Sequence, residues 1–509
     1  MNDNQLNKKR VIKNTLLLYI RMFVLMVVSF VTTRVILRSL GEVDYGLNNA
    51  LAGFVALFGL LTGSLNAAIA RFITYELGQG DLDKLNRIFC SSILIQVGMA
   101  AAVAVLVETV GIWFLNTHMV IPPERMVASK LVLRFAVVST SITLIFLPYS
   151  AVIISHERMN IYAYVSVFEG CLNLFIAYIV SMDLGMDRLV FYSVSLCVSV
   201  FIVNMIYRMY CIRNFPECRF KLVFDTDLLK KIGGFSSWNM IGAASGVLKN
   251  QGVNILFNMF FGPAVNAAQA VSNQASNLST KFSNGFMTAM DPQITKSYAT
   301  GNFNYMYSLV FQGTRMAFFL FFLIALPIFV KTDTIISLWL GNPPLHTVAF
   351  IRIMLATLFV NSIFANPLVT VMLASGKIRN YQLVVGGIQT LSFPLAYIML
   401  KTGNSPESAL FMVLIIAVLC MVVRVAMLRG MIGFPVAEYI KKVLFPIFSV
   451  IFLTLPIPIA AYITAPNGFW WDILVCVTAE LCGIAAIWLA GFEKKEKQTV
   501  LSKIKTFVS

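Results

Sequence analysis

Charged side chains are scarce in this sequence: Asp, Glu, Lys and Arg make up only 12% of its 509 residues, roughly half their share in soluble domains. Apolar residues account for 58%, and the mean hydropathy is +0.80. These values exclude a soluble protein, a disordered chain and a disulfide scaffold. An outer-membrane β-barrel is excluded as well, because its alternating strands are only about 10 residues long.

Motifs that would indicate an enzyme are also missing. The sequence has no phosphate-binding G-x-x-x-x-G-K-[ST] loop, no H-E-x-x-H and no Cys-x-x-Cys. Its three histidines, His118, His156 and His346, fall in predicted loops, and His156 reads as a solvated loop residue. The connections between apolar segments are too short for a catalytic domain. We therefore expect no catalytic residues, no cofactor and no metal site, and we interpret the eight cysteines as reduced or buried.

Long apolar runs are what the sequence does contain, and they predict an all-α integral membrane protein of about fourteen transmembrane helices. A helix needs about 20 mostly apolar residues to span a bilayer. The predicted spans are 14–37, 45–68, 88–115, 128–153, 161–182, 188–210, 235–260, 266–290, 307–330, 347–373, 381–400, 408–429, 443–464 and 470–491. The seventh and eighth spans are unusually polar.

The formal charge of +16 follows from the distribution of basic residues between the two sides of the membrane. With the N-terminus inside, 26 Lys and Arg residues fall in the inner connections and 6 in the outer ones. Inner connections of membrane proteins are typically the basic ones. This asymmetry predicts that both termini are cytoplasmic. It also accounts for most of the positive charge, so no nucleic-acid partner is needed to explain that charge.

An internal repeat appears when the sequence is shifted along itself so that Gly41 falls on Gly262. The same shift matches Gly46 with Ala267. Further matches pair Ile73 with Ile294, Thr74 with Thr295, Gly80 with Gly301 and Asp81 with Asn302. Six helices separate the two copies, so the copies have the same orientation, as in transporters with parallel repeats. We predict two pseudo-symmetric six-helix lobes, 1–220 and 221–430, followed by two further helices in 431–509.

The eighth span carries a polar face. At about 100° per residue, one arc of the helix holds Asn266, Gln269, Asn273, Asn277, Thr280, Lys281, Asn284 and Asp291. On the seventh span Asn239, Gly246, Asn250, Asn254 and Asn258 share a face, and Lys249 lies about a quarter turn away. On the first span Asn14 and Arg21 align with Thr32 and Ser39.

Two interpretations of these faces remain open. Asparagine amides can join helices by hydrogen bonds inside a membrane. The number of amides, and the basic residues beside them, favour the face of a water-filled cavity instead. The Ala52, Ala56, Gly59, Gly63, Ala67 and Ala70 stripe of the second span favours close helix packing. Arg34, Arg134, Arg315 and Arg352 are expected to extend toward the membrane interface.

Few acidic residues lie within the spans. Glu169, flanked by Ser166 and Asn173, is the best candidate for a buried carboxylate. It is either an ion or proton site or the partner of a basic residue.

The N-terminal stretch KNTLLLYIRMFVLMVVSFVTTRVILRSLGEVDYGLNNALAGF, with its L-G-x-x-x-Y-G turn, resembles polysaccharide flippases. So does ARFITYELGQGD at the end of the second span. These flippases form a family within the multidrug/oligosaccharidyl-lipid/polysaccharide exporter superfamily. The resemblance implies two lobes around a central cavity lined by helices 1, 2, 7 and 8. It also implies transport of an undecaprenyl-diphosphate-linked oligosaccharide, the repeat unit of an O-antigen or capsule, from the inner to the outer leaflet.

For a substrate of this kind, we expect the polar faces to bind the diphosphate and the sugar. Arg21, Lys249 and Lys281 are expected to hold the diphosphate, because arginine and lysine are the usual phosphate ligands. Amides suit sugar hydroxyls, so the residues expected to line the sugar-binding cavity are Asn14, Asn250, Asn254, Asn258, Asn273, Asn277 and Asn284. The expected partners are the lipid-linked oligosaccharide, membrane lipids and the polysaccharide polymerase machinery, and the expected location is the bacterial inner membrane.

Three other functions compete with this one. A drug or cation antiporter of the same superfamily would share the fold, but it calls for carboxylates in the cavity. A membrane enzyme of envelope polysaccharide synthesis calls for long outer loops and clustered acid and base residues. A peptidoglycan-precursor flippase is the alternative that the sequence separates least well. Neither the saccharide carried nor the energy source follows from the sequence.

Overall fold

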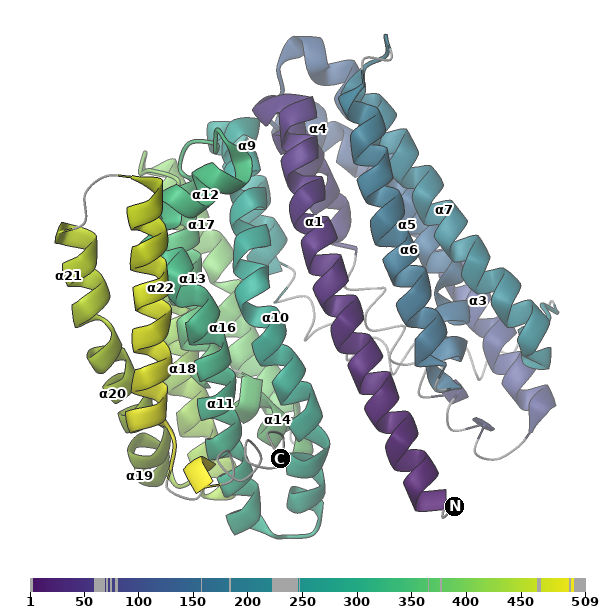
Figure 1. The fold of residues 1–509 in the computed structure, drawn as a ribbon. Helices are drawn as coiled ribbons and strands as arrows, with labels where there is room; N and C mark the ends of the chain where they lie inside the picture. The colour runs from purple at the N-terminus through teal and green to yellow at the C-terminus, as the bar shows by residue number, and fades with distance from the viewer. Residues whose placement is uncertain are drawn as a thin grey trace. The chain divides into compact units, whose positions relative to one another are not determined.

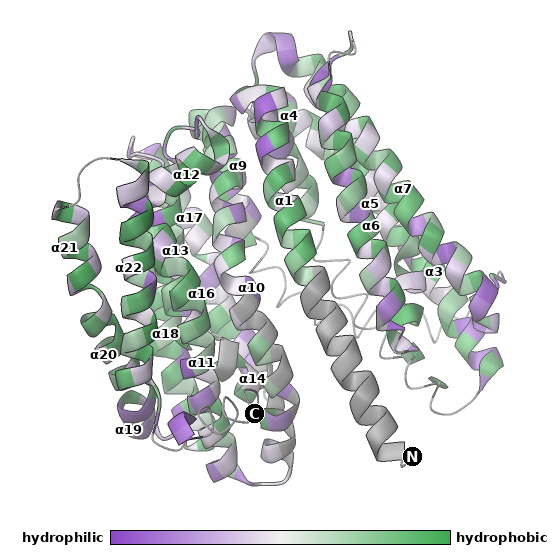
Figure 2. Cartoon of the chain, in the orientation of Figure 1, coloured by the Kyte–Doolittle hydropathy of each residue, from purple (hydrophilic) through white to green (hydrophobic). Residues whose placement is uncertain are grey.

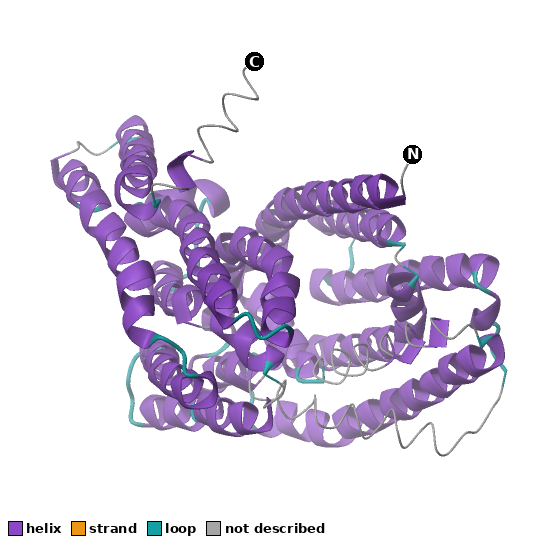
Figure 3. Cartoon of the chain, turned by 90° about the horizontal axis from the view of Figure 1, so that it is seen from below, coloured by secondary structure: helices purple, strands orange, loops and turns teal. Residues whose placement is uncertain are grey.

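The computed structural model describes residues 3–58, 69, 72–73, 76–77, 81–156, 158–182, 185–221, 246, 248–364, 366–375, 378–464, 468–493 and 496–498. Only the backbone is described for residues 3–21, 159, 250, 282, 284–285, 288–289, 292, 295–296, 299, 366–367, 373–374 and 378–379. These parts of the chain form helices joined by short turns, and no strand occurs among them (Figure 3). The all-α fold predicted from the sequence is confirmed.

The chain divides into two compact units, residues 1–270 (unit 1) and 271–509 (unit 2). The lobe boundaries expected near residues 220 and 430 stay a prediction. The helices of unit 1 are α1 (Asp3–Ala56), α3 (Leu82–Leu106), α4 (Ile112–Thr117), α5 (Met126–Ser155), α6 (Met159–Ser181), α7 (Arg188–Asn214) and α9 (Val253–Phe261). Short π or 3-10 turns accompany them: η1 (Val107–Gly111), η2 (Pro123–Arg125), η3 (Pro216–Cys218) and η4 (Leu248–Gly252).

Helix α10 (Pro263–Ala299) begins in unit 1 and continues in unit 2. The other helices of unit 2 are α11 (Phe303–Val330), α12 (Thr332–Leu340), α13 (Thr347–Phe364), α14 (Asn366–Ala374), α15 (Ile378–Tyr381), α16 (Gly387–Thr390), α17 (Ser392–Lys401), α18 (Glu407–Ile432), α19 (Val436–Tyr439), α20 (Phe445–Thr454), α21 (Pro456–Thr464) and α22 (Phe469–Ala486). Its π turns are η5 (Gln382–Gly386), η6 (Ile440–Leu444) and η7 (Ile487–Gly491). Figure 1 shows most of these helices.

Eleven helices within the described residues are long and apolar enough to cross a membrane. Each of the fourteen predicted spans overlaps a described helix, and the lower number has physical causes. The first two spans are the two helical segments of α1, which meet at Gly41, where the backbone is not helical. The eighth span is α10, whose polar face lowers its hydropathy. Part of the seventh span lies outside the described residues.

The outward faces of the helices are apolar. Phe452 on α20 is 77% exposed and Trp470 on α22 is 78% exposed, and Figure 2 shows hydrophobic residues along most of α18 and α22. In water such surfaces would promote aggregation, whereas in a bilayer they contact lipid tails. The structure therefore fits a multi-pass membrane protein.

The two glycine turns that the repeat pairs have the same backbone conformation. Gly41 has φ 76° and ψ 174°, and Gly262 has φ 81° and ψ −174°. Residues other than glycine rarely adopt such a positive φ. The next paired feature is a helix cap. Asp81 accepts a hydrogen bond from Lys84 N, 3.0 Å away, at the start of α3, and Asn302 accepts one from Tyr305 N, 3.2 Å away, at the start of α11. Backbone geometry thus supports the sequence repeat.

Candidate functional site

Helix α10 is continuous through the predicted polar face, so the spacing of its polar residues does place them on one side. Exposure changes along that face. Asn266 and Gln269 are buried, Asn273 and Lys281 are half-buried, and Asn277 is exposed. The face is therefore closed at its beginning and open between Asn273 and Lys281, where amides and a lysine are accessible.

The closed part is a hydrogen-bonded contact between helices of unit 1. Asn254 on α9 accepts a hydrogen bond from Asn49 on α1 (3.2 Å), and its own amide donates to the Asn49 carbonyl (3.2 Å). Asn266 donates to the Asn254 side chain and carbonyl at 2.8 and 2.6 Å. Asn258, which is fully buried, accepts from Val120 N at 3.0 Å. In this conformation Asn254 joins α9 to α1 and α10, and Asn258 joins α9 to the loop at Val120, so a role for them in sugar binding stays a prediction.

The side chains of Asn14, Arg21, Asn250 and Asn284 lie outside the described residues, so their expected roles also stay predictions. Lys249 lies in η4 and is half-buried. At the far end of the α10 face, Asp291 accepts a 2.7 Å hydrogen bond from the Thr370 hydroxyl of α14. Thr370 therefore fixes the orientation of the one carboxylate predicted at the edge of this face.

A pocket of about 290 Å³ lies inside unit 1, among α1, α5, α6 and α7. Glu169 and Asn173 of α6 line it, together with Asn48 of α1 and the hydroxyl-bearing Ser139 and Thr140 of α5. Ser199 of α7 donates to Asn173 at 3.0 Å. A carboxylate, amides and hydroxyls around one small cavity are suitable ligands for a proton or a small cation.

The small residues of the second span have two different roles. Ala52 and Ala56 line the pocket beside Glu169. The close contact is instead made by Gly53, whose hypothetical Cβ would lie 2.4 Å from Asn254 Nδ2. The expectation of close packing along the alanines is therefore wrong by one position. Gly59, Gly63, Ala67 and Ala70 lie outside the described residues.

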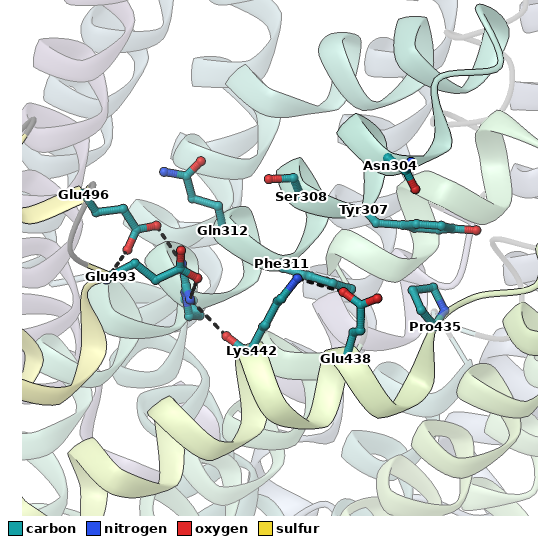
Figure 4. Close-up of a pocket in the computed structure, with 11 residues that line it drawn as sticks. Asn304, Tyr307, Ser308, Phe311, Gln312, Pro435, Glu438, Lys442, Glu493 and Glu496 are labelled. Atoms are coloured by element: carbon teal, nitrogen blue, oxygen red, sulfur yellow. Dashed lines mark hydrogen bonds and ion pairs between the residues drawn. The ribbon is translucent and has the colours of Figure 1, made fainter.

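Arg315 is buried and paired, and its expected extension toward the membrane interface stays a prediction. Its side chain is 3% exposed, and it forms ion pairs with Glu493 (2.7 Å) and Glu496 (2.6 Å). It also donates to the Lys442 carbonyl at 3.0 Å. These groups lie in a polar pocket of about 490 Å³ between α11 and the α19–η6 segment (Figure 4). The chain after α22 supplies the counterions, because a buried arginine requires them.

The other interfacial arginines pair with acids. Arg134 contacts Glu108 at 2.6 Å, and Arg352 contacts Asp333 at 2.9 Å. Arg134 is 54% exposed and Arg352 39%, and their expected extension toward the membrane interface stays a prediction.

His156 is not the free loop residue that its sequence context suggested. Its Nε2 lies 2.6 Å from Glu217 Oε1, and its ring stacks on Phe215 with centroids 4.0 Å apart. Glu217 is buried. A spacing of 61 residues between the partners gave no local signal from which the pair could have been predicted.

The cysteines of the described residues are free thiols. Cys218, outside the membrane-spanning helices, is buried. A hydrogen bond with Cys211 and burial both raise its pKa well above the usual range. Within the described part of the chain, no three His, Cys, Asp or Glu side chains are grouped to hold a metal ion.

Comparison with known proteins finds one family model and several solved structures that this chain resembles. Residues 249–398, which include all of α10, match the MatE family model. None of the curated proteins compared matches the sequence significantly. The structure resembles the lipid II flippase MurJ in an inward closed conformation, with TM-score 0.65 and 13% identity over 93% of this chain and 99% of that one.

Two further similar structures are transporters of the MOP superfamily. An inward-facing multidrug resistance MATE transporter has TM-score 0.68 and 12% identity over 81% of this chain and 96% of its own. A transporter from Pyrococcus furiosus with a binding pocket of reversed polarity has TM-score 0.61 and 14% identity over 82% and 94%. The chain thus has the fold of MOP superfamily transporters and flippases, and its residues 249–398 match the MatE family model.

Proposed function

We propose that this protein is a flippase that moves an undecaprenyl-diphosphate-linked oligosaccharide from the cytoplasmic to the periplasmic leaflet of the bacterial inner membrane. Both termini lie in the cytoplasm in this proposal. Transport proceeds by alternating access, in which one lobe rocks against the other around the site. A polysaccharide polymerase is the natural recipient of the product.

The observation that carries the proposal is the open part of the α10 face. Asn273 and Asn277 present amides there, which can both donate to and accept from sugar hydroxyls. Lys281, one turn further on, presents a positive charge suited to a diphosphate. Arg21 and Lys249 are the other proposed diphosphate ligands. Asn14, Asn250, Asn254, Asn258 and Asn284 are proposed to contact the sugar in conformations where their side chains reach it.

The pocket around Glu169 supplies a separate place for energy coupling. It lies within unit 1 and is lined by α1, α5, α6 and α7. A proton or sodium ion bound at Glu169 would alter the packing of these four helices, and thereby the balance between conformations. The ion pocket and the α10 face share no lining residue, so a cation and an anionic lipid would not compete for the same side chains.

The extent of the structural similarity also supports the lipid substrate. The MurJ flippase aligns with 93% of this chain, and the MATE transporter aligns with 81%. One specific observation favours a second candidate, a cation-coupled multidrug antiporter, because the MatE match spans α10 itself. Against it stands the chemistry of the open face, where a lysine would repel cationic drugs.

Deleting the gene in its own bacterium tests the proposal. We expect loss of surface polysaccharide, together with accumulation of single undecaprenyl-linked repeat units detected by mass spectrometry. A plasmid copy should restore the polymer, and a Lys281→Gln copy should not. Unchanged lipid intermediates and surface polymer, with increased sensitivity to cationic drugs, would favour the antiporter.

A further inference from the structure

Two ion pairs occupy nearly corresponding positions in the sequence repeat, in which Asp187 falls on Ser408, one residue after Glu407. Arg125 directly precedes α5, and its Nη1 lies 2.6 Å from Asp187 Oδ2. The shift that carries Gly41 onto Gly262 carries Arg125 onto His346, which directly precedes α13, and His346 Nδ1 lies 2.5 Å from Glu407 Oε1. The partners are separated by 62 residues in the first pair and 61 in the second. Each pair therefore joins the beginnings of two helices that pack together within one unit, α5 with α7 and α13 with α18.

The two pairs differ in how they are built. Arg125 is held at two places, because it also donates from Nε to Asp44 of α1 at 2.7 Å. Asp187 in turn caps α7 by accepting from Leu189 N at 3.0 Å. Within the described part of the chain, His346 forms its ion pair with Glu407 alone. In unit 1, Arg125 therefore contacts two carboxylates, those of Asp44 and Asp187. In unit 2, the imidazole of His346 contacts one carboxylate, that of Glu407.

The backbone at His346 is strained. Its φ is 69°, the only positive φ outside glycine among the described residues. A residue with a Cβ keeps this conformation only where surrounding contacts hold it. The short contact with Glu407 is one such restraint, and the Phe350 ring, stacked with its centroid 6.0 Å from that of His346, is another. Loss of the Glu407 contact would let the turn before α13 relax.

Arginine stays charged at all physiological pH values, whereas histidine changes its charge between about pH 5 and 8. We propose that the His346–Glu407 pair is a pH-sensitive latch that joins the beginnings of α13 and α18. These helix ends lie on the predicted periplasmic side, so the latch would respond to the pH outside the cytoplasm. Arg125 and Asp187 form the permanently charged counterpart of the latch.

The groups around the latch fix the direction of its response. Glu407 of α18 is the acidic group that contacts the imidazole, which lies at the beginning of α13. The next charges on α12 and α13 are Asp333 and Arg352, which pair with each other at 2.9 Å. The adjoining face of α10 contributes Ser272, which donates to the Thr347 carbonyl and does not titrate. A charged imidazolium attracts the Glu407 carboxylate more strongly than a neutral imidazole does, so the latch is strongest at acid pH and weakens as pH rises.

Hydrogen exchange of the purified full-length protein in lipid nanodiscs, measured by mass spectrometry from pH 5.5 to 8.5, tests the latch. After correction for the intrinsic pH dependence of exchange, amides of 341–350 and 403–410 should exchange about threefold or more faster at the alkaline end. Peptides around Arg125 and Asp187 should show no such change. His118→Gln, at another predicted outer loop, is the matched control and should behave like the wild type.

Two variants of His346 distinguish exchange that is controlled by the His346–Glu407 pair from exchange that reflects local flexibility alone. His346→Arg copies the chemistry of unit 1 and should give slow exchange at every pH. His346→Gly relieves the positive φ while it removes the contact, so the chain should fold and exchange quickly at every pH. Wild-type exchange that is independent of pH, or a His346→Gly variant that keeps the wild-type pH response, would overturn the proposal. These readouts do not depend on the transported substrate.

Discussion

Gly41 and Gly262, which fall on one another in the sequence repeat, adopt nearly the same left-handed backbone conformation, with φ of 76° and 81° and ψ of 174° and −174°. Each follows a helix and redirects the chain into the next one. A sequence match between two glycines could arise by chance, but a shared positive φ is a conformational requirement. The repeat is thus a property of the fold as well as of the sequence.

Gly46 is predicted to be intolerant of any side chain. A Cβ at this position would lie 1.7 Å from the Pro263 carbonyl oxygen, and that atom belongs to backbone. Gly46→Ala should therefore destabilise the protein by about 1–3 kcal/mol through overpacking. The measurement is the thermal unfolding midpoint of the purified protein in detergent.

Gly98→Ala is the matched control, since Gly98 lies within α3 and its Cβ would meet nothing within 4 Å. This substitution should be neutral or should stabilise the helix by roughly 0.5–1 kcal/mol. Equal unfolding midpoints for the two variants would show that α1 does not approach Pro263 as closely as described.

Removal of the segment that carries Glu493 and Glu496 should show how much free energy these counterions contribute to burying Arg315. A chain ending at Phe492 lacks Glu493 and Glu496, so the buried guanidinium keeps the Lys442 carbonyl but loses both counterions. We expect destabilisation of about 3–5 kcal/mol, as for other broken buried ion pairs. Thermal unfolding in detergent measures it.

A chain ending at Gln498 keeps both glutamates and should match the full-length protein. Arg315→Met in the shorter chain should restore most of the lost stability, because the charge that needs a partner is then gone. If the shorter chain is as stable as the longer one, the two ion pairs do not hold this segment.

Because the Cys218 thiol is buried, we expect the folded protein to lose stability at alkaline pH. Its hydrogen bond with Cys211 and its burial raise the pKa of the folded thiol above the value of about 8.5 found in unfolded chains. The folded state therefore binds this proton more tightly. The resulting stability is complete below about pH 8.5 and falls by up to about 1.4 kcal/mol per pH unit above it.

The comparison is the slope of the unfolding free energy against pH, from 8 to 10, in the wild type and in Cys218→Ala. The alanine variant should have the shallower slope, whatever its absolute stability. Indistinguishable slopes would mean that this thiol titrates alike in the folded and unfolded chains.

The periodicity of the sequence was sufficient to predict much of this structure. Apolar runs located the long helices, because the bilayer fixes both their length and their composition. The spacing of Asn266, Asn273 and Lys281 placed them on one face, since α10 is a regular helix. The internal repeat paired both glycine turns and both helix caps from the sequence alone.

Contacts between distant residues could not be predicted in the same way. Nothing in the sequence near Arg315 points to Glu493, 178 residues away, or near His156 to Glu217. Whether an asparagine joins helices or faces solvent also depends on its neighbours: Asn254 and Asn277 belong to one residue type, yet the first is buried and the second exposed.

The most direct test of the flippase proposal is transport by the purified protein in liposomes. The substrate is the undecaprenyl-diphosphate-linked repeat unit recovered from the deletion strain, and its outward movement is followed by oxidation of the sugar with an impermeant reagent. Wild-type protein and Lys281→Arg should move the lipid, and Lys281→Gln should be about tenfold slower or worse. Lipid movement no faster than in protein-free liposomes, or equal rates for the glutamine variant, would contradict the account.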